Sequence, residues 1–147
     1  MRSKEYLQQI RKLDRLIENK CYEADHWKSV ACGTSTYSDG ERVQSSGSKQ
    51  KMADAIDRYI DLQAEIDAEI DRLVGMKREV IRTIEVLPEK EYDVLHKFYV
   101  QGMTFDEIAD FHGKSYSWAT SVHGRALANL QRVLDDRKVS ELNETTD

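Results

Sequence analysis

Residues Thr104–Leu130 carry the pattern that decides the fold, and they read TFDEIADFHGKSYSWATSVHGRALANL. Thr104 and Glu107 have the T-x-x-E spacing of a capping box, which predicts that a helix starts here. Gly113 comes where that helix must end, because glycine adopts the left-handed conformation at little cost. Ser115 then predicts the cap of a second helix. Two short helices joined at a glycine predict a helix-turn-helix, with an ordinary helical hairpin as the alternative.

The second predicted helix has an apolar face and a polar face. The apolar stripe that we expect to be buried comprises Ala119, Val122, Ala126, Leu127 and Leu130. In a helix-turn-helix the second helix enters the major groove of DNA, led by its N-terminal residues. We therefore expect the base edges to be read by Tyr116, Ser117, Thr120 and Ser121. Because hydroxyl groups make permissive base contacts, the specificity of this helix alone is expected to be modest.

Basic residues in and around this helix are the candidates for contacts with the DNA backbone, which position a protein without reading sequence. The predicted phosphate contacts are Lys114, His123, Arg125, Arg132, Arg137 and Lys138. Trp118 has two interpretations, since it could fill the core or stand exposed at a DNA or polymerase face. We expect partial burial, because a large aromatic side chain in a small domain usually belongs to the core.

Further motifs on both sides extend this stretch into a longer pattern. They comprise Leu87-Pro88-Glu89, Val94-Leu95, Tyr99, Gly102-Met103-Thr104-Phe105, Glu107-Ile108-Ala109, Ser115, Val122, Arg125-Ala126-Leu127 and Leu130. This pattern covers roughly the last third of the chain and resembles region 4 of sigma-70-type transcription factors. The four predicted base-reading residues align with the positions that region 4 uses in the major groove. They depart from the family, which often has Arg, Glu and Gln there.

With the long helices upstream, the whole chain resembles small phage-encoded regulators of the ArpU- and RinA-type late-gene activator group. The resemblance implies a DNA-binding regulator of phage or prophage transcription that works in the cytoplasm of a bacterial host. Its implied partners are double-stranded DNA and, as a further candidate, bacterial RNA polymerase. Two alternatives remain open: a small-terminase-like DNA-packaging subunit, and a polymerase-binding adaptor without tight DNA binding of its own.

Two longer helices are predicted upstream, at about residues 3–31 and 50–86, because apolar residues recur there at steps of three and four. Such heptad spacing is typical of a coiled coil. The second helix cannot bury its stripe alone, so either the first helix folds back on it or two chains pair. We expect both, and hence a homodimer. The predicted oligomerisation seam comprises Met52, Ile56, Tyr59, Ile66, Ile70, Leu73, Val80 and Ile84.

These elements predict an all-α chain in which coiled-coil-like helices precede a three-helix module similar to region 4. Residues 1–87 are expected to form the oligomerisation region, with a flexible Gly-, Ser- and Thr-rich loop at 32–50. Residues 88–138 are expected to form the helix-turn-helix module. Residues 139–147 are expected to form a frayed polar tail.

Composition narrows the possible functions. A formal net charge of −5 argues against tight nonspecific binding to nucleic acid. The two cysteines, Cys21 and Cys32, are too few for a disulfide framework or a zinc site, so we expect neither metal nor cofactor. The sequence has no apolar run near the roughly 18 residues of a membrane span and no secretion signal, so no membrane contact is expected. Without a nucleophile elbow, a carboxylate pair or a phosphate loop, enzymatic activity is not expected.

Overall fold

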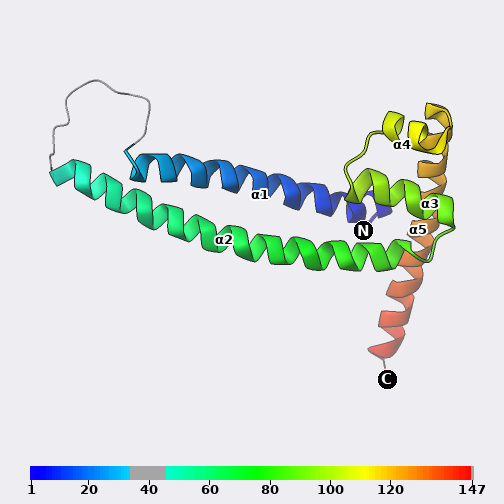
Figure 1. Ribbon diagram of the computed structural model, residues 1–147. Helices are drawn as coiled ribbons and strands as arrows, with labels where there is room; N and C mark the ends of the chain where they lie inside the picture. Colours follow the sequence, from blue (N-terminus) through cyan, green and yellow to red (C-terminus); the bar gives the residue numbers. More distant parts are fainter. Residues whose placement is uncertain (34–45, 147) are drawn as a thin grey trace. The chain divides into compact units, whose positions relative to one another are not determined.

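The structure is a computed structural model that describes residues 1–33 and 46–146. Its described part contains helices and no strand, which confirms the predicted all-α fold (Figure 1). The elements are α1 (Ser3–Ala31), α2 (Ser46–Ile84), α3 (Glu89–Leu95), the π-helix η1 (His96–Val100), α4 (Phe105–His112) and α5 (Tyr116–Glu144). Much of the predicted loop, residues 34–45, lies outside the described residues. Residues 46–50, also assigned to that loop, form the first turn of α2 instead.

The chain divides into two compact units. The hairpin unit consists of Leu13–Leu73, and the helix-turn-helix unit combines Met1–Lys12 with Val74–Asp147. Helices α1 and α2 therefore contribute to both units. This division differs from the predicted boundary between residues 87 and 88, because apolar residues at the start of α1 and the end of α2 are buried within the helix-turn-helix unit. They are Leu7, Ile10, Val80 and Ile84.

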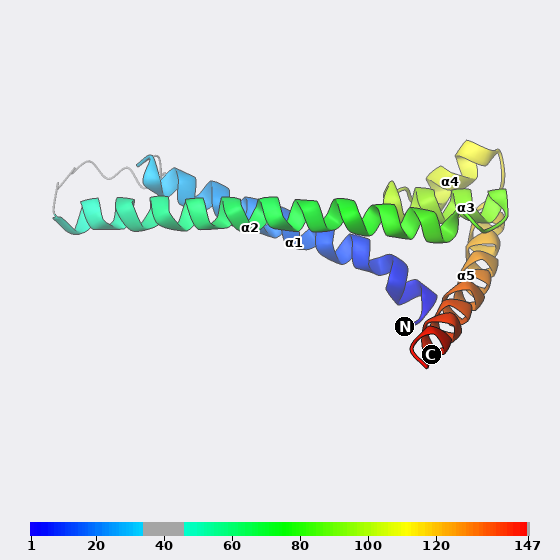
Figure 2. The same ribbon diagram turned by 90° about the horizontal axis from the view of Figure 1, so that it is seen from below.

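In the hairpin unit, the second part of α1 packs antiparallel against α2 (Figures 1 and 2). The core of this unit contains Ala24, Leu62 and Ile66. Lys20 lies 3.5 Å from a carboxylate oxygen of Glu65. The intrachain hairpin, one of the two arrangements expected from the sequence, is thus present. Exposed ion pairs of this kind contribute little, so the apolar contacts supply most of the stabilisation.

In the helix-turn-helix unit, α3, α4 and α5 pack around one apolar core. The buried members of this core are Val94, Ile108, Ala109, Ala119 and Val122. Trp118 is half-buried and packs against this core, which confirms the interpretation favoured from the sequence. Ala126 and Leu130 are also fully buried, whereas Leu127 is half-buried. The predicted apolar stripe of the second helix is therefore correct in all but the degree of burial of one residue.

The predicted caps of α4 and α5 are both formed. The Thr104 hydroxyl accepts a hydrogen bond from the backbone N–H of Glu107 at 3.2 Å. The Ser115 hydroxyl accepts a hydrogen bond from the backbone N–H of Trp118 at 3.1 Å. Gly113 ends α4 with φ +63°, in the left-handed region that favours glycine. These interactions fix the turn between the two helices.

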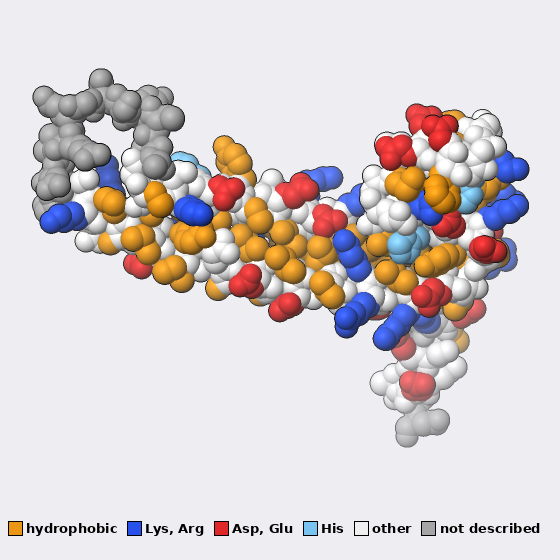
Figure 3. Space-filling view, viewed as in Figure 1, with side chains coloured by type: hydrophobic (Ala, Val, Ile, Leu, Met, Phe, Trp, Pro, Cys, Tyr) orange, Lys and Arg blue, Asp and Glu red, His pale blue; other side chains and the backbone are white. Residues whose placement is uncertain are grey.

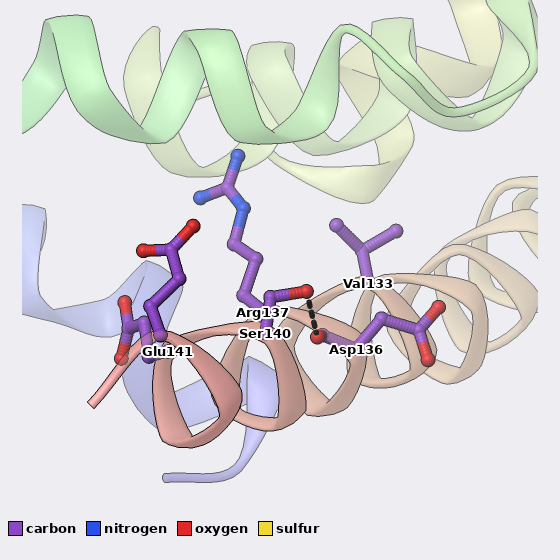
Figure 4. Close-up of a pocket in the computed structure, with 6 residues that line it drawn as sticks. Val133, Asp136, Arg137, Ser140 and Glu141 are labelled. Atoms are coloured by element: carbon purple, nitrogen blue, oxygen red, sulfur yellow. Dashed lines mark hydrogen bonds between the residues drawn. The ribbon is translucent and has the colours of Figure 1, made fainter. Parts of the chain in front are cut away.

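The predicted frayed tail is wrong for residues 139–144, because α5 continues without a break to Glu144. Neither glycine nor proline occurs in this segment to interrupt the backbone hydrogen bonds. The hydroxyl of Ser140 donates to the backbone carbonyl of Asp136 at 3.1 Å, within the same helix (Figure 4). The polar composition of residues 139–144 indicated exposure to solvent, and an exposed helix has that composition as well as a frayed tail does.

A polar pair lies inside the aromatic part of the helix-turn-helix unit. The Tyr99 hydroxyl and His123 Nε2 are 2.8 Å apart. Burial raises the pKa of Tyr99 to about 12, so the phenol keeps its proton. Burial also lowers the pKa of His123, and the nearby cations of Lys4 and Arg11 lower it further. In the tautomer that carries its proton on Nδ1, neutral His123 accepts the hydrogen bond that Tyr99 donates through its hydroxyl.

The first testable consequence is a pH-dependent stability that originates at His123. Its folded-state pKa lies below the unfolded value of about 6.5. The contribution is therefore complete above about pH 6.5 and is lost as the pH falls through the folded-state pKa. His123→Gln keeps an acceptor for Tyr99 but does not titrate. Urea unfolding between pH 7.5 and 5 should show a smaller loss of stability in this variant than in wild type.

The control is His26→Gln, at an exposed position in the hairpin unit. Equal losses of stability in wild type and His123→Gln would refute the assignment to His123.

A second prediction compares two glycines that both face open space. Gly113→Ala should lower the unfolding free energy by about 1 kcal/mol, because alanine would have to adopt a positive φ. Gly75→Ala, within α2, should raise it by about 0.5–1 kcal/mol through its better helix propensity. Urea unfolding at one fixed protein concentration measures both. Equal effects of the same sign would show that the Gly113 conformation does not constrain the turn.

Candidate nucleic-acid interface

The first turns of α5 present an exposed polar face. Ser117, Ser121 and Arg125 are exposed and recur every four residues, so they share one side of the helix. Tyr116 is 54% exposed and meets the Phe105 ring edge-on, at 6.0 Å between centroids. This face follows directly from the Ser115 cap and the turn before it. The geometry suits insertion of the helix N-terminus into a groove.

Thr120 differs from the other predicted base-reading residues. It is half-buried, and its hydroxyl donates to the backbone carbonyl of Ser117 at 3.1 Å. The hydroxyl can still accept a hydrogen bond from a base, although its donor is used. The structure therefore brings Tyr116, Ser117 and Ser121 to the surface and leaves Thr120 at its edge.

The predicted phosphate contacts separate into three groups. Lys114, Arg125 and Arg132 are exposed, and the two arginines lie on the same side of α5 as Ser121. His123 is turned inward and takes part in packing with Tyr99. The remaining two, Arg137 and Lys138, lie about 30 Å along α5 from the base-reading turns, at 1.5 Å per residue.

Arg137 has an intramolecular role at its end of α5. Its side chain extends from α5 toward α2 (Figure 4), where Nη1 donates to Thr83 Oγ1 at 2.7 Å. A shallow groove of about 380 Å³ lies beside it. The groove is lined by Val133, Asp136, Arg137, Ser140, Glu141 and Glu144. Because carboxylates outnumber the single guanidinium, this groove does not suit DNA phosphates.

A second polar network joins α3, η1 and the end of α4. Asp93 contacts Lys97 Nζ through Oδ1 at 2.8 Å and His112 Nε2 through Oδ2 at 2.5 Å. Partial burial raises the pKa of Asp93, but the hydrogen bonds from Lys97 and His112 outweigh it, and the pKa lies below its usual value. Burial, followed by the charge of Lys97, lowers the pKa of His96. The network ties α4 to α3 and so supports the orientation of the turn before α5.

Charge is distributed unequally between the two units. The helix-turn-helix unit has 14 Lys or Arg residues against 14 Asp or Glu residues. The hairpin unit has 8 against 13, so it carries the whole net charge of −5. The repulsion from DNA that the overall charge suggested is therefore absent from the unit that holds α5.

The described residues contain neither a metal-binding cluster nor a membrane-spanning helix. Within them, no group of three or more His, Cys, Asp or Glu side chains is placed to hold a metal ion. None of the described helices is long and apolar enough to cross a membrane.

Comparison with known proteins supports the assignment of the turn and α5. Residues 83–132, about a third of the chain, match the family described as Sigma-70, region 4. The match begins inside α2, before the boundary predicted at residue 88.

A curated relative gives the same indication. It is the RNA polymerase sigma factor SigO of Bacillus subtilis (strain 168), which is 28% identical over 102 residues. The alignment covers 69% of this chain and 53% of the relative, so the chain spans about half of that protein. No solved structure matches the chain. Residues 83–132 therefore form a helix-turn-helix similar to sigma-70 region 4, which supports a DNA-binding role connected with transcription.

Proposed function

We propose that the chain is a transcription regulator of phage or prophage origin that binds a promoter or operator as a homodimer. The observation that carries this proposal is the exposed polar start of α5, held by a capped turn within a segment similar to sigma-70 region 4. The long helices that precede this segment support the phage origin, since the regulators that the chain resembles share this layout. Its proposed place is the bacterial cytoplasm, and its proposed role is binding rather than catalysis.

Base reading is assigned to the hydroxyl-rich face of α5. Ser117 and Ser121 are exposed and recur on the side of the helix that leads into the groove. Each hydroxyl can donate to or accept from a base edge, so each contributes modest discrimination. Arg125, further along the same side, is placed to contact a phosphate. Affinity in this arrangement comes from a few backbone contacts, and specificity comes from weak base contacts.

Dimerisation is assigned to the part of the predicted seam that the hairpin leaves uncovered. Ile66, Val80 and Ile84 are buried within the chain, and Tyr59 and Leu73 are half-buried.

The remaining seam residues are exposed. Met52, Ile56 and Ile70 keep between 40% and 46% of their surface. Met52 and Ile70 are about five full turns apart, so they lie on the same side of α2, and Ile56 is close to it. Hydrophobic side chains gather along the visible face of this hairpin (Figure 3). A second copy of the hairpin is the occupant that would cover this stripe, because it offers the same apolar surface.

A protein-binding alternative rests on a different surface. Phe111 is 67% exposed, and its ring covers Lys97 Nζ at 4.3 Å. A groove of about 420 Å³ beside it is lined by Glu89, Lys90, Tyr92, Asp93, Phe111 and His112. An exposed aromatic residue next to a groove favours a protein partner such as RNA polymerase. This observation supports the adaptor alternative.

The DNA-binding proposal predicts different effects for hydroxyl and arginine variants. Ser121→Ala should weaken binding to the specific fragment about fivefold, the loss of one modest hydrogen bond of about 1 kcal/mol. Arg125→Gln should weaken binding to all duplexes and reduce the slope of log affinity against log salt by about one. Fluorescence anisotropy on fragments flanking the gene, with salt varied between about 50 and 200 mM, measures both effects.

Ser140→Ala removes a hydroxyl at the far end of α5 and is the matched control. Specific binding that is unaffected by both Ser117→Ala and Ser121→Ala would contradict the assignment of the recognition helix. Capture of RNA polymerase without DNA binding at low salt would favour the adaptor.

The dimer proposal predicts that one introduced charge separates the chains. Ile56→Lys or Ile70→Lys should convert a particle of twice the 17.0 kDa chain mass into a monomer, because lysine cannot be buried in an apolar contact. Ala64→Lys adds the same charge at an exposed position off this side of α2 and is the control. Light scattering during gel filtration gives the mass. A wild-type monomer would refute the dimer, and roughly eight or more subunits would favour the packaging alternative.

A further inference from the structure

The start of α1 is fastened directly to α5. The backbone N–H of Ser3 donates to Gln131 Oε1 at 2.7 Å, and its hydroxyl donates to the Leu127 carbonyl at 2.9 Å. Leu7 and Ile10 are fully buried in the same unit. Figures 1 and 2 show the first turns of α1 beside α5. The first turns of α1 are therefore part of the unit that holds the recognition helix.

Two further contacts fix the rotation of α1 about its axis. Arg11 Nη2 donates to the Phe98 carbonyl at 2.7 Å, and its guanidinium lies 4.1 Å from the Phe98 ring centroid. The Tyr6 hydroxyl lies 3.1 Å from Thr83 Oγ1. Lys4 and Arg11 are seven residues apart, which is about two turns, so they share one side of α1. The position of Arg11 against η1 therefore directs Lys4 to the same side.

Lys4 follows Ser3 and so lies next to α5 at the level of Leu127. Its side chain is exposed, and no described carboxylate forms an ion pair with it. Its charge also contributes to the lowered pKa of His123, one turn before Leu127. A lysine in this position is an uncompensated cation beside the second and third turns of α5.

Cations on both sides of a helix inserted into the major groove strengthen its binding, because phosphates lie on both sides. The major groove is about 12 Å wide, so a helix inside it has a sugar-phosphate backbone on either side. Arg125 and Arg132 lie on one side of α5. On the other side, marked by His123 and Leu127, the only predicted contact near the recognition turns is the inward-facing histidine. Lys138 shares that side but lies about 16 Å further along α5 than Leu127.

We propose that Lys4 binds a DNA backbone phosphate on the side of α5 opposite to Arg125. The first turns of α1 are then a third element of the DNA-binding surface, together with the turn and the recognition helix. Residues 1–12 contain four Lys or Arg residues and one Glu, so they supply the positive charge that the rest of the unit lacks. This inference rests on the proposed DNA-binding function.

The test compares Lys4→Gln with wild type in salt titrations on specific and unrelated duplexes. The variant should lose affinity for both by a similar factor, and the slope of log affinity against log salt should fall by about one. Lys4→Arg should restore the slope. Lys28→Gln makes the same charge change on the same helix in the hairpin unit and should leave the slope at the wild-type value.

The outcomes also distinguish this inference from the function on which it rests. No DNA binding by wild type would remove the proposed function. Specific binding by wild type, with an unchanged slope in Lys4→Gln, would overturn the Lys4 contact alone. Reduced affinity with a lower melting temperature and an unchanged slope would show that Lys4 only stabilises the fold, which also overturns the contact.

Discussion

The placement of α1 within the helix-turn-helix unit depends on the contact between Arg11 and Phe98. Carbonyl groups in the last turn of a helix lack intrahelical donors, and η1 ends close to Phe98. The guanidinium of Arg11 donates to that carbonyl and lies over the Phe98 ring. Such a cation–π contact contributes about 1 kcal/mol. One side chain thus satisfies a backbone group and anchors α1, which in turn places Ser3 and Lys4 beside α5.

The proposed DNA surface combines weak base contacts with a limited positive field. Hydroxyl side chains such as Ser117 and Ser121 discriminate less than the bidentate pairs that arginine and glutamine make. The hairpin unit carries the acidic excess and repels phosphate, so only the helix-turn-helix unit is suited to contact the DNA backbone. The proposed dimer would offset both weaknesses, because linking two modules raises the effective concentration of the second at its half-site. The exposed apolar stripe of α2 and the modest recognition helix therefore complement each other.

Local features and the α1–α2 hairpin could be predicted from the sequence, whereas the contacts that join Met1–Lys12 to the helix-turn-helix unit could not. The end of α4 at Gly113 and the partial burial of Trp118 follow from neighbouring residues and from amphipathic spacing. The inclusion of Met1–Lys12 in the helix-turn-helix unit, and the packing of His123 against an aromatic core, join segments that share no local pattern. The end of α5 at Glu144 was misplaced because polar composition describes exposure rather than backbone conformation. The base-reading and phosphate-contacting residues stay predictions, since exposure alone does not identify a bound partner.

The contact between Ser3 and Gln131, separated by 128 positions, has a consequence for synthesis on the ribosome. On the ribosome, Leu7 and Ile10 leave the exit tunnel well before α5, and they become buried only after α5 has been made. The hairpin unit consists of one continuous segment, so it can fold earlier and bring the second part of α1 beside α2. This shortens the effective loop that the later contact must close, and it lowers the entropic cost. Vectorial folding would therefore begin within Leu13–Leu73, and Met1–Lys12 would join Val74–Asp147 afterwards.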